Sequence, residues 1–157
     1  MDEASITQYI LDTFAGVETA TAFGYTFFFY RSDHKLPFAT LGTQDDDYDR
    51  ASNLNRPSVF RLNIGVSKDT YRSLFGPQPA APGAEGVVDT GHDFTVLDQL
   101  LPHPVYAPQS WVCVLNPSAE TFQTVRPLLA EAYDLAASRN AKREARSSGP
   151  TEGGQSA

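Results

Sequence analysis

Hydrophobic positions repeat with helical spacing near both ends of the chain and with strand spacing in between. Residues 5–16 place four apolar side chains on one helical stripe: Ile6, Tyr9, Ile10 and Phe14. Ser5 is the predicted N-cap of this helix, and Gly16 suits its end. Near the other end, Ser118 is predicted to cap a short turn. A long helix then begins near Val125, because Pro127 is tolerated only in a first turn.

Four segments between these helices have the alternation or the aromatic content of strands: residues 23–31, 36–43, 58–66 and 110–115. In the third, Leu62 and Ile64 point to one face, whereas Arg61 and Asn63 point to the other. A short helix is predicted over residues 68–75. Residues 44–57 are polar and are predicted to form an exposed loop. Residues 86–102 fit either a short edge strand or a helical turn.

The order of these elements predicts the fold class. Strands come in a run with helices at the two ends, which is typical of an α+β domain whose antiparallel sheet carries its helices on one face. A chain of 157 residues suits one domain. We therefore expect a single domain over residues 1–146. The polar, glycine-containing residues 147–157 are expected to form a disordered tail.

Several stretches together resemble known domains. They include AGVETATAFGYTFFFY, LPFATLG, FRLNIGVSKDTYRSLFG and the ending HPVYAPQSWVCVLNPSAETFQTVRPLLAEAYDLA. Their order is similar to that of the MmcQ/YjbR-like domains, with counterparts at Gly16-Val17-Glu18, Phe23-Gly24, Trp111 and residues 132–135. The chain more closely resembles an uncharacterised actinobacterial domain family with an RPxVFRLNxG core, which here is RPSVFRLNIG. The first resemblance implies a compact α+β fold and a proposed DNA-binding role. The second implies no activity.

Composition and charge narrow the classes of function. A single Cys excludes an intramolecular disulfide. The acidic start MDEASITQ lacks the basic region of a secretory signal. Together these observations lead us to expect a cytoplasmic protein. The longest apolar run, YTFFFY, is too short to span a membrane. Net charge is −7. Residues 1–135 hold 8 basic and 17 acidic side chains, a net charge of −9, which argues against nucleic acid as a partner.

The acidic run in residues 45–49 is the first candidate for metal chemistry. Its aspartates have the spacing of the first three ligands of a calcium-binding loop, but arginines stand where that loop needs a glycine and a bidentate glutamate. The main interpretation is a solvated loop. A divalent site built from Asp45, Asp46 and Asp47 is the minor alternative. We expect no bound metal and no cofactor.

Arg61 and Asn63 share one face of a predicted strand, and Arg56 precedes it. If that face is covered, both residues need partners, and a buried Arg beside an Asn can bind a carboxylate or a phosphate. They are then ligand-binding candidates together with Arg56. If the face is open, they are ordinary surface residues.

The stretch LPHPVYAPQSWVCVL, residues 101–115, holds the second group of candidates. His103 lies between two prolines that keep its backbone extended, and its ordinary pKa near neutrality suits an acid or a base. His103 and Tyr106 are the catalytic candidates, and Gln109 and Trp111 are predicted to bind the ligand beside them. The alternative for His103 is a contact with an aromatic ring or a backbone carbonyl. Cys113 is predicted to be a small buried apolar residue.

Three functional hypotheses follow. The first is a small-molecule-binding domain, or an acid/base enzyme, in which Arg61 and Asn63 hold an anionic group and His103 or Tyr106 moves a proton. It requires these residues to meet in one concave pocket. The second is a non-catalytic protein-interaction domain, and the third, which follows from the MmcQ/YjbR resemblance, is a DNA-binding domain. A monomer or a homodimer is expected in each case.

Overall fold

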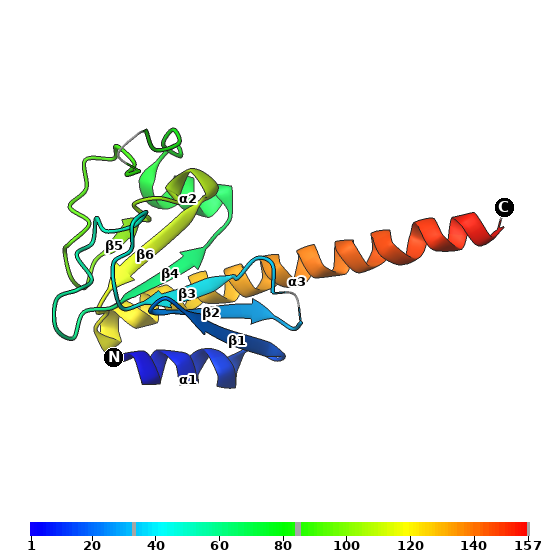
Figure 1. Cartoon of the computed structure of the whole chain (residues 1–157), viewed down its shortest axis with the longest axis horizontal. Coiled ribbons are helices and arrows are strands. Elements are labelled where there is room, and N and C mark those ends of the chain that lie inside the picture. Colours follow the sequence, from blue (N-terminus) through cyan, green and yellow to red (C-terminus); the bar gives the residue numbers. More distant parts are fainter. Residues whose placement is uncertain (33, 84–85, 157) are drawn as a thin grey trace.

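A computed structural model describes residues 1–32, 34–83 and 86–156, the last ten of them by their backbone alone. Its three α-helices are α1 (Glu3–Thr13), α2 (Lys68–Phe75) and α3 (Ala119–Ser156). The strands in the described residues are β1 (Val17–Ala22), β2 (Tyr25–Tyr30), β3 (Ala39–Gly42), β4 (Arg61–Gly65), β5 (Leu100–Pro102) and β6 (Trp111–Leu115) (Figure 1). The tail predicted to be disordered, residues 147–157, lies outside the residues described in full.

The strands form one sheet in the order β1-β2-β3-β4-β6-β5, and every neighbouring pair of these strands is antiparallel. The predicted α+β class and antiparallel sheet are therefore confirmed. The sequence did not predict β1, whose alternating Thr and Ala side chains mark a largely exposed edge strand rather than a buried one. A tight turn at Phe23 and Gly24, both with positive φ, joins β1 to β2.

The main core lies between the helices and one face of the sheet. Side chains from β2, β3, β4 and β6 meet the apolar stripes of α1 and α3 there, and α2 adds the buried Tyr71. The sheet contributes Phe28, Ala39, Leu41, Leu62, Ile64, Val112 and Val114, and the two long helices contribute Ile6, Ile10, Phe122, Val125, Leu129, Ala132 and Ala136. These residues alternate along their strands with those of the opposite face, against which none of the three α-helices packs. The side chains of this helix-free face are therefore not needed for the main core.

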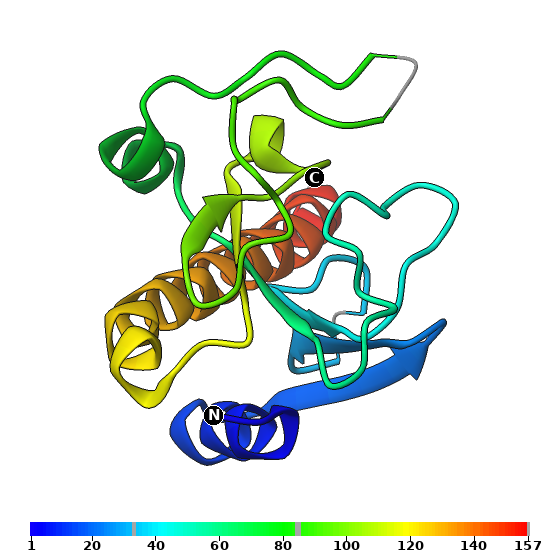
Figure 2. The same cartoon turned by 90° about the vertical axis from the view of Figure 1, so that its left-hand side faces the viewer.

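A loop over residues 43–60 covers part of the helix-free face (Figure 2). It buries Leu54 against a second, smaller cluster that contains Leu101, Cys113 and Leu115 of the sheet. The prediction of an exposed loop is wrong at this point, because the loop also buries Asp49 and Ser52. Two of its aspartates fold the loop onto itself: Asp45 accepts the Leu54 N–H at 2.8 Å, and Asp46 accepts those of Tyr48 and Asp49 at 2.7 Å.

The helix ends differ from the sequence prediction. Asp2, rather than Ser5, caps α1, and its carboxylate accepts the Ser5 N–H at 2.8 Å. Ser118 is a cap as predicted, and its hydroxyl accepts the Thr121 N–H at 3.1 Å, but it caps the long helix itself and not a separate short turn. However, α3 continues through Pro127 without a break. Burial of Val125 and Leu129 against the sheet, on either side of the proline, stabilises the helix there.

The helix α3 extends well beyond the sheet toward the C-terminus (Figure 1). None of the helices in the described part of the chain combines the length and the apolarity needed to cross a bilayer.

Candidate functional site

Arg61 lies at the centre of a polar network on the helix-free face, and its side chain is 0% exposed. Its Nε donates to Asn63 Oδ1 at 2.7 Å, and its Nη1 donates to Ser52 Oγ at 2.9 Å and to Asp49 Oδ1 at 3.1 Å. Its Nη2 donates to the other Asp49 oxygen and to Tyr25 Oη, the latter at 3.3 Å. A guanidinium has five N–H donors, so all five are used within the chain.

The protonation states of this network follow from burial and pairing. Burial by itself would lower the pKa of the Arg61 guanidinium, but the hydrogen bonds and the charge of Asp49 outweigh burial and raise that pKa, so Arg61 stays charged. Burial also raises the pKa of the Tyr25 hydroxyl above its ordinary value. Tyr25 therefore keeps its proton at neutral pH. Burial raises the pKa of the Cys113 thiol to about 12, which agrees with its prediction as an inert buried residue.

His103 is 3% exposed and lies at the edge of the network. Its Nδ1 accepts the backbone N–H groups of Val105 at 3.1 Å and Tyr106 at 3.0 Å, which places the ring proton on Nε2. That Nε2 lies 3.8 Å from Asp49 Oδ2 and 3.4 Å from Arg61 Nη2. Burial and the charge of Arg61 hold the pKa of His103 well below its ordinary value. The imidazole is therefore neutral, and its one lone pair is already occupied by the backbone.

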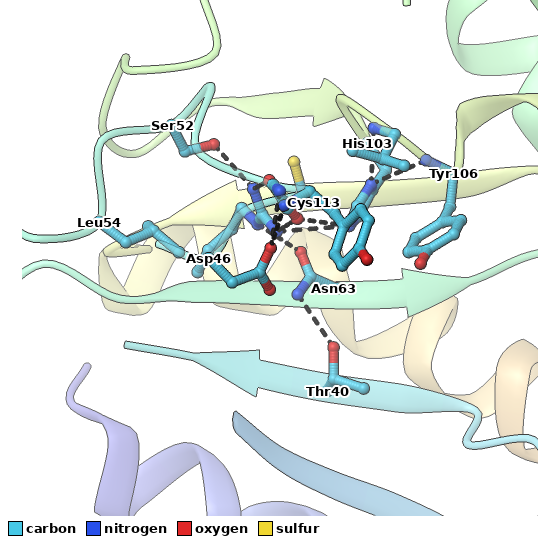
Figure 3. Close-up of polar contacts among 12 residues, drawn as sticks. Thr40, Asp46, Ser52, Leu54, Asn63, His103, Tyr106 and Cys113 are labelled. Atoms are coloured by element: carbon cyan, nitrogen blue, oxygen red, sulfur yellow. Dashed lines mark hydrogen bonds and ion pairs between the residues drawn. The ribbon is translucent and has the colours of Figure 1, made fainter. Parts of the chain in front are cut away.

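A cavity of about 680 Å³ lies beside this network. Thr40 and Asn63 line it from the neighbouring strands β3 and β4, and Figure 3 shows them joined by a hydrogen bond, with His103 and Tyr106 nearby. Most of the remaining surface is apolar or aromatic. The aromatic residues that line the cavity are Tyr25, Phe27, Phe38, Tyr48, Tyr106 and Trp111. Its charged residues are Asp46, Asp49 and Arg139.

Two glycines make room for the aromatic rings on either side of Thr40 and Asn63. A Cβ atom added at Gly65 would lie 2.9 Å from Trp111 Cε2, and one at Gly42 would lie 2.6 Å from Tyr25 Cε2. Gly65 pairs with Trp111 and Gly42 pairs with Tyr25 in the sheet. Each ring therefore leans over the strand next to its own, in a position that a side chain at the paired residue would block.

The structure brings together most of the residues that the sequence singled out. Asn63, His103, Tyr106, Gln109 and Trp111 all line the one cavity, although they come from two distant parts of the chain.

The two arginines lie elsewhere. Arg61 is buried beneath the cavity with its donors engaged. Arg56 donates to the backbone carbonyls of Ser52, Asn53 and Thr95, so it holds the loop of residues 43–60 to a later segment of the chain.

The site residues that the sequence did not reveal include three polar ones beside Arg61 and Asn63: Tyr25, Thr40 and Asp49. A strand register would have found two of them, because Thr40 pairs with Asn63, and Gly42 pairs with both Tyr25 and Arg61. The sequence holds no such signal for Asp49, since its place opposite Arg61 depends on the path of a loop without regular structure.

Comparison with known proteins gives a family but no function. Neither the curated proteins nor the solved structures include a significant match to this chain. The family match covers residues 1–145, which include every residue that lines the cavity. The chain therefore belongs to a family of unknown function, DUF6194.

Proposed function

We propose that this protein is a small-molecule-binding domain whose ligand occupies the cavity between the aromatic side chains of β2 and β6. The observation that carries the proposal is the cavity itself. Its volume of about 680 Å³ lies within the range of small-molecule sites, which are mostly apolar and contain a few placed polar groups. Two of its aromatic side chains are not packed in the core, since Tyr48 is 83% exposed and Tyr106 is 51% exposed, and such rings favour a flat, largely apolar ligand.

The charges around the cavity favour a neutral ligand. Asp49 is neutralised by Arg61, and the other two charged residues that line the cavity, Asp46 and Arg139, carry opposite charges. An anionic group bound directly by Arg61, as the sequence suggested, would have to displace one of the five internal hydrogen bonds of that side chain. The proposal therefore assigns Arg61 the role of positioning Asn63 and Tyr25.

The proposal is limited to binding. A general base needs a free lone pair within reach of the substrate, and the lone pair of His103 accepts two backbone N–H groups. Proton transfer by Tyr106 stays a prediction. So does the finer assignment of the fold as MmcQ/YjbR-like, which agrees with the α+β class of the structure.

Trp111 makes the proposal directly testable, because it is the only tryptophan of the chain and it lines the cavity. Its indole N–H gives one isolated cross-peak in a ¹H–¹⁵N correlation spectrum. We expect that peak to shift on titration with a small flat probe. Suitable probes are indane, indole and 1-indanone. In a separate experiment, native mass spectrometry of the protein purified from its own host would detect a retained ligand. If none of the three probes moves the Trp111 peak and the purified protein is bare, the proposal is wrong.

Replacing Tyr106 with alanine is expected to weaken binding about tenfold for any probe that shifts the Trp111 peak. The reason is that stacking of a flat ring on one aromatic side chain contributes on the order of 1–2 kcal/mol. Tyr106 is 51% exposed, so the change should leave the fold intact. Phe23→Ala is the matched control, since Phe23 is 85% exposed and does not line the cavity. The dissociation constants come from the same NMR titration, and equal losses in both variants would contradict the site.

A further inference from the structure

We infer that the ligand presents a carbonyl oxygen to Thr40 and Asn63, so that the domain selects flat molecules that carry a hydrogen-bond acceptor. The inference rests on the proposed function and adds the chemical class of the ligand to it. It follows from the direction of the hydrogen bonds in the network, which Arg61 sets.

Arg61 is a donor at every position and accepts nothing. It therefore fixes which atoms of its neighbours face it. Asn63 turns its Oδ1 toward Arg61 Nε, and Tyr25 turns a lone pair of its hydroxyl toward Arg61 Nη2. Both neighbours use an oxygen lone pair to accept from the arginine, so the N–H groups of Asn63 and the O–H group of Tyr25 can donate to other partners.

The orientation that Arg61 imposes on Asn63 also determines the hydrogen bond between Asn63 and Thr40. Asn63 Nδ2 donates one N–H to Thr40 Oγ1 at 2.9 Å, so the threonine oxygen is the acceptor of that bond. Within the described residues, the second Asn63 N–H and the Thr40 hydroxyl proton have no acceptor. Thr40 is 8% exposed and Asn63 is 1% exposed, and both line the cavity. Two buried donors therefore face the space in which a ligand would lie.

The aromatic residues add donors of the same kind. The Tyr25 hydroxyl accepts from Arg61 and keeps its proton, and no acceptor for that proton occurs in the part of the chain that the structure describes. The indole of Trp111 can only donate. His103 offers the ligand no acceptor either, since its Nδ1 accepts backbone N–H groups and its protonated Nε2 lies beside Asp49 Oδ2, at 3.8 Å.

Such a surface discriminates between ligands of the same shape. A ligand oxygen that accepts from Thr40 or Asn63 satisfies buried donors, whereas a ligand without an acceptor leaves them unpaired when it displaces water. A protonated amine placed there would face these donors with further donors, because an ammonium group has no acceptor. A carbonyl is favoured over a carboxylate because Asp46 and Asp49 balance Arg61 and Arg139, so these side chains supply no excess positive charge.

The test compares 1-indanone with indane, which has the same fused rings but lacks the carbonyl. We expect 1-indanone to bind at least ten times more tightly in the Trp111 titration. We also expect Thr40→Val to reduce that preference several-fold, because valine has the shape of threonine without its hydroxyl. Thr40→Ser, which keeps the hydroxyl, should retain the preference. Tyr25→Phe is a second variant that removes one donor and should also reduce the preference.

The possible outcomes separate the two proposals. Equal binding of indane and 1-indanone would overturn the inference and leave the cavity as a binding site. A preference for 1-indanone that survives in both Thr40→Val and Tyr25→Phe would also overturn it. If no probe perturbs Trp111 in the unmodified protein and the protein purified from its host is bare, the proposed function itself fails. The spectrum of each variant shows whether it is folded, so a loss of binding through unfolding is recognised.

Discussion

Replacing Arg61 with methionine is expected to lower the free energy of unfolding by about 3–5 kcal/mol. The change leaves the carboxylate of Asp49 buried without a cation, since Asp49 is only 7% exposed. It also removes the donors that satisfy Asn63 Oδ1, Ser52 Oγ and Tyr25 Oη. Urea unfolding followed by far-UV circular dichroism measures the loss.

Two controls identify the origin of that loss. Arg50 follows Asp49 in the sequence, and its side chain is exposed. The variant Arg50→Met should therefore change the free energy of unfolding by less than about 0.5 kcal/mol. The double variant Asp49→Leu, Arg61→Met removes the buried charges together and should recover at least half of the stability lost in the single variant. If the double variant is as unstable as Arg61→Met alone, the packing of the arginine side chain, and not its pairing, stabilises this region.

The second large effect expected is on the pH dependence of stability. In the unfolded chain, His103 takes up a proton near pH 6.5. In the folded protein its pKa lies well below that value, because the ring is buried and lies beside Arg61. Below pH 6.5 the unfolded state therefore binds more protons than the folded state, so stability falls as pH falls. The slope approaches about 1.4 kcal/mol per pH unit between 6.5 and the folded-state pKa.

His103→Asn isolates this contribution. Asparagine places an acceptor near the position of Nδ1, where Val105 and Tyr106 donate, and it does not take up a proton. The free energy of unfolding of both proteins is measured from pH 7.5 to pH 5. Their difference removes the titration of the carboxylates that both share. We expect the wild-type curve to fall more steeply below pH 6.5, and parallel curves would show that His103 is accessible to protons in the folded state.

Strand alternation accounts for part of what the sequence predicted about the site. Alternation placed Arg61 and Asn63 on one face of β4, and separately placed Trp111 and Cys113 on one face of β6. The observed register, in which Asn63 pairs with Cys113, shows that the two faces are the same. Since β4 and β6 are neighbours in the sheet, these two predictions meet in one place. The period of a strand is a local property, so one sequence is enough to recognise it.

Elements that depend on distant contacts were not predictable in this way. The loop of residues 43–60 is polar in composition, yet it buries Asp49 because Arg61 lies opposite, and nothing local to the loop carries that information. Likewise, α3 tolerates Pro127 because the sheet holds the helix on either side of it. The edge strand β1 was missed because its exposed position demands no large apolar residues.

The division of the sheet into two faces has a simple arithmetic form. In β2, β4 and β6 the even-numbered residues, such as Phe28, Leu62 and Val112, belong to the core with the helices. The odd-numbered residues belong to the side with the cavity, and in β3 the parity is reversed. Residues of the main core and residues of the cavity side therefore alternate along the same short strands. Substitutions that reshape the cavity at Asn63, Trp111 or Thr40 therefore leave the side chains of the main core unchanged. Arg61, Cys113 and Leu115 on the same face are different, because they are themselves buried and contribute to stability.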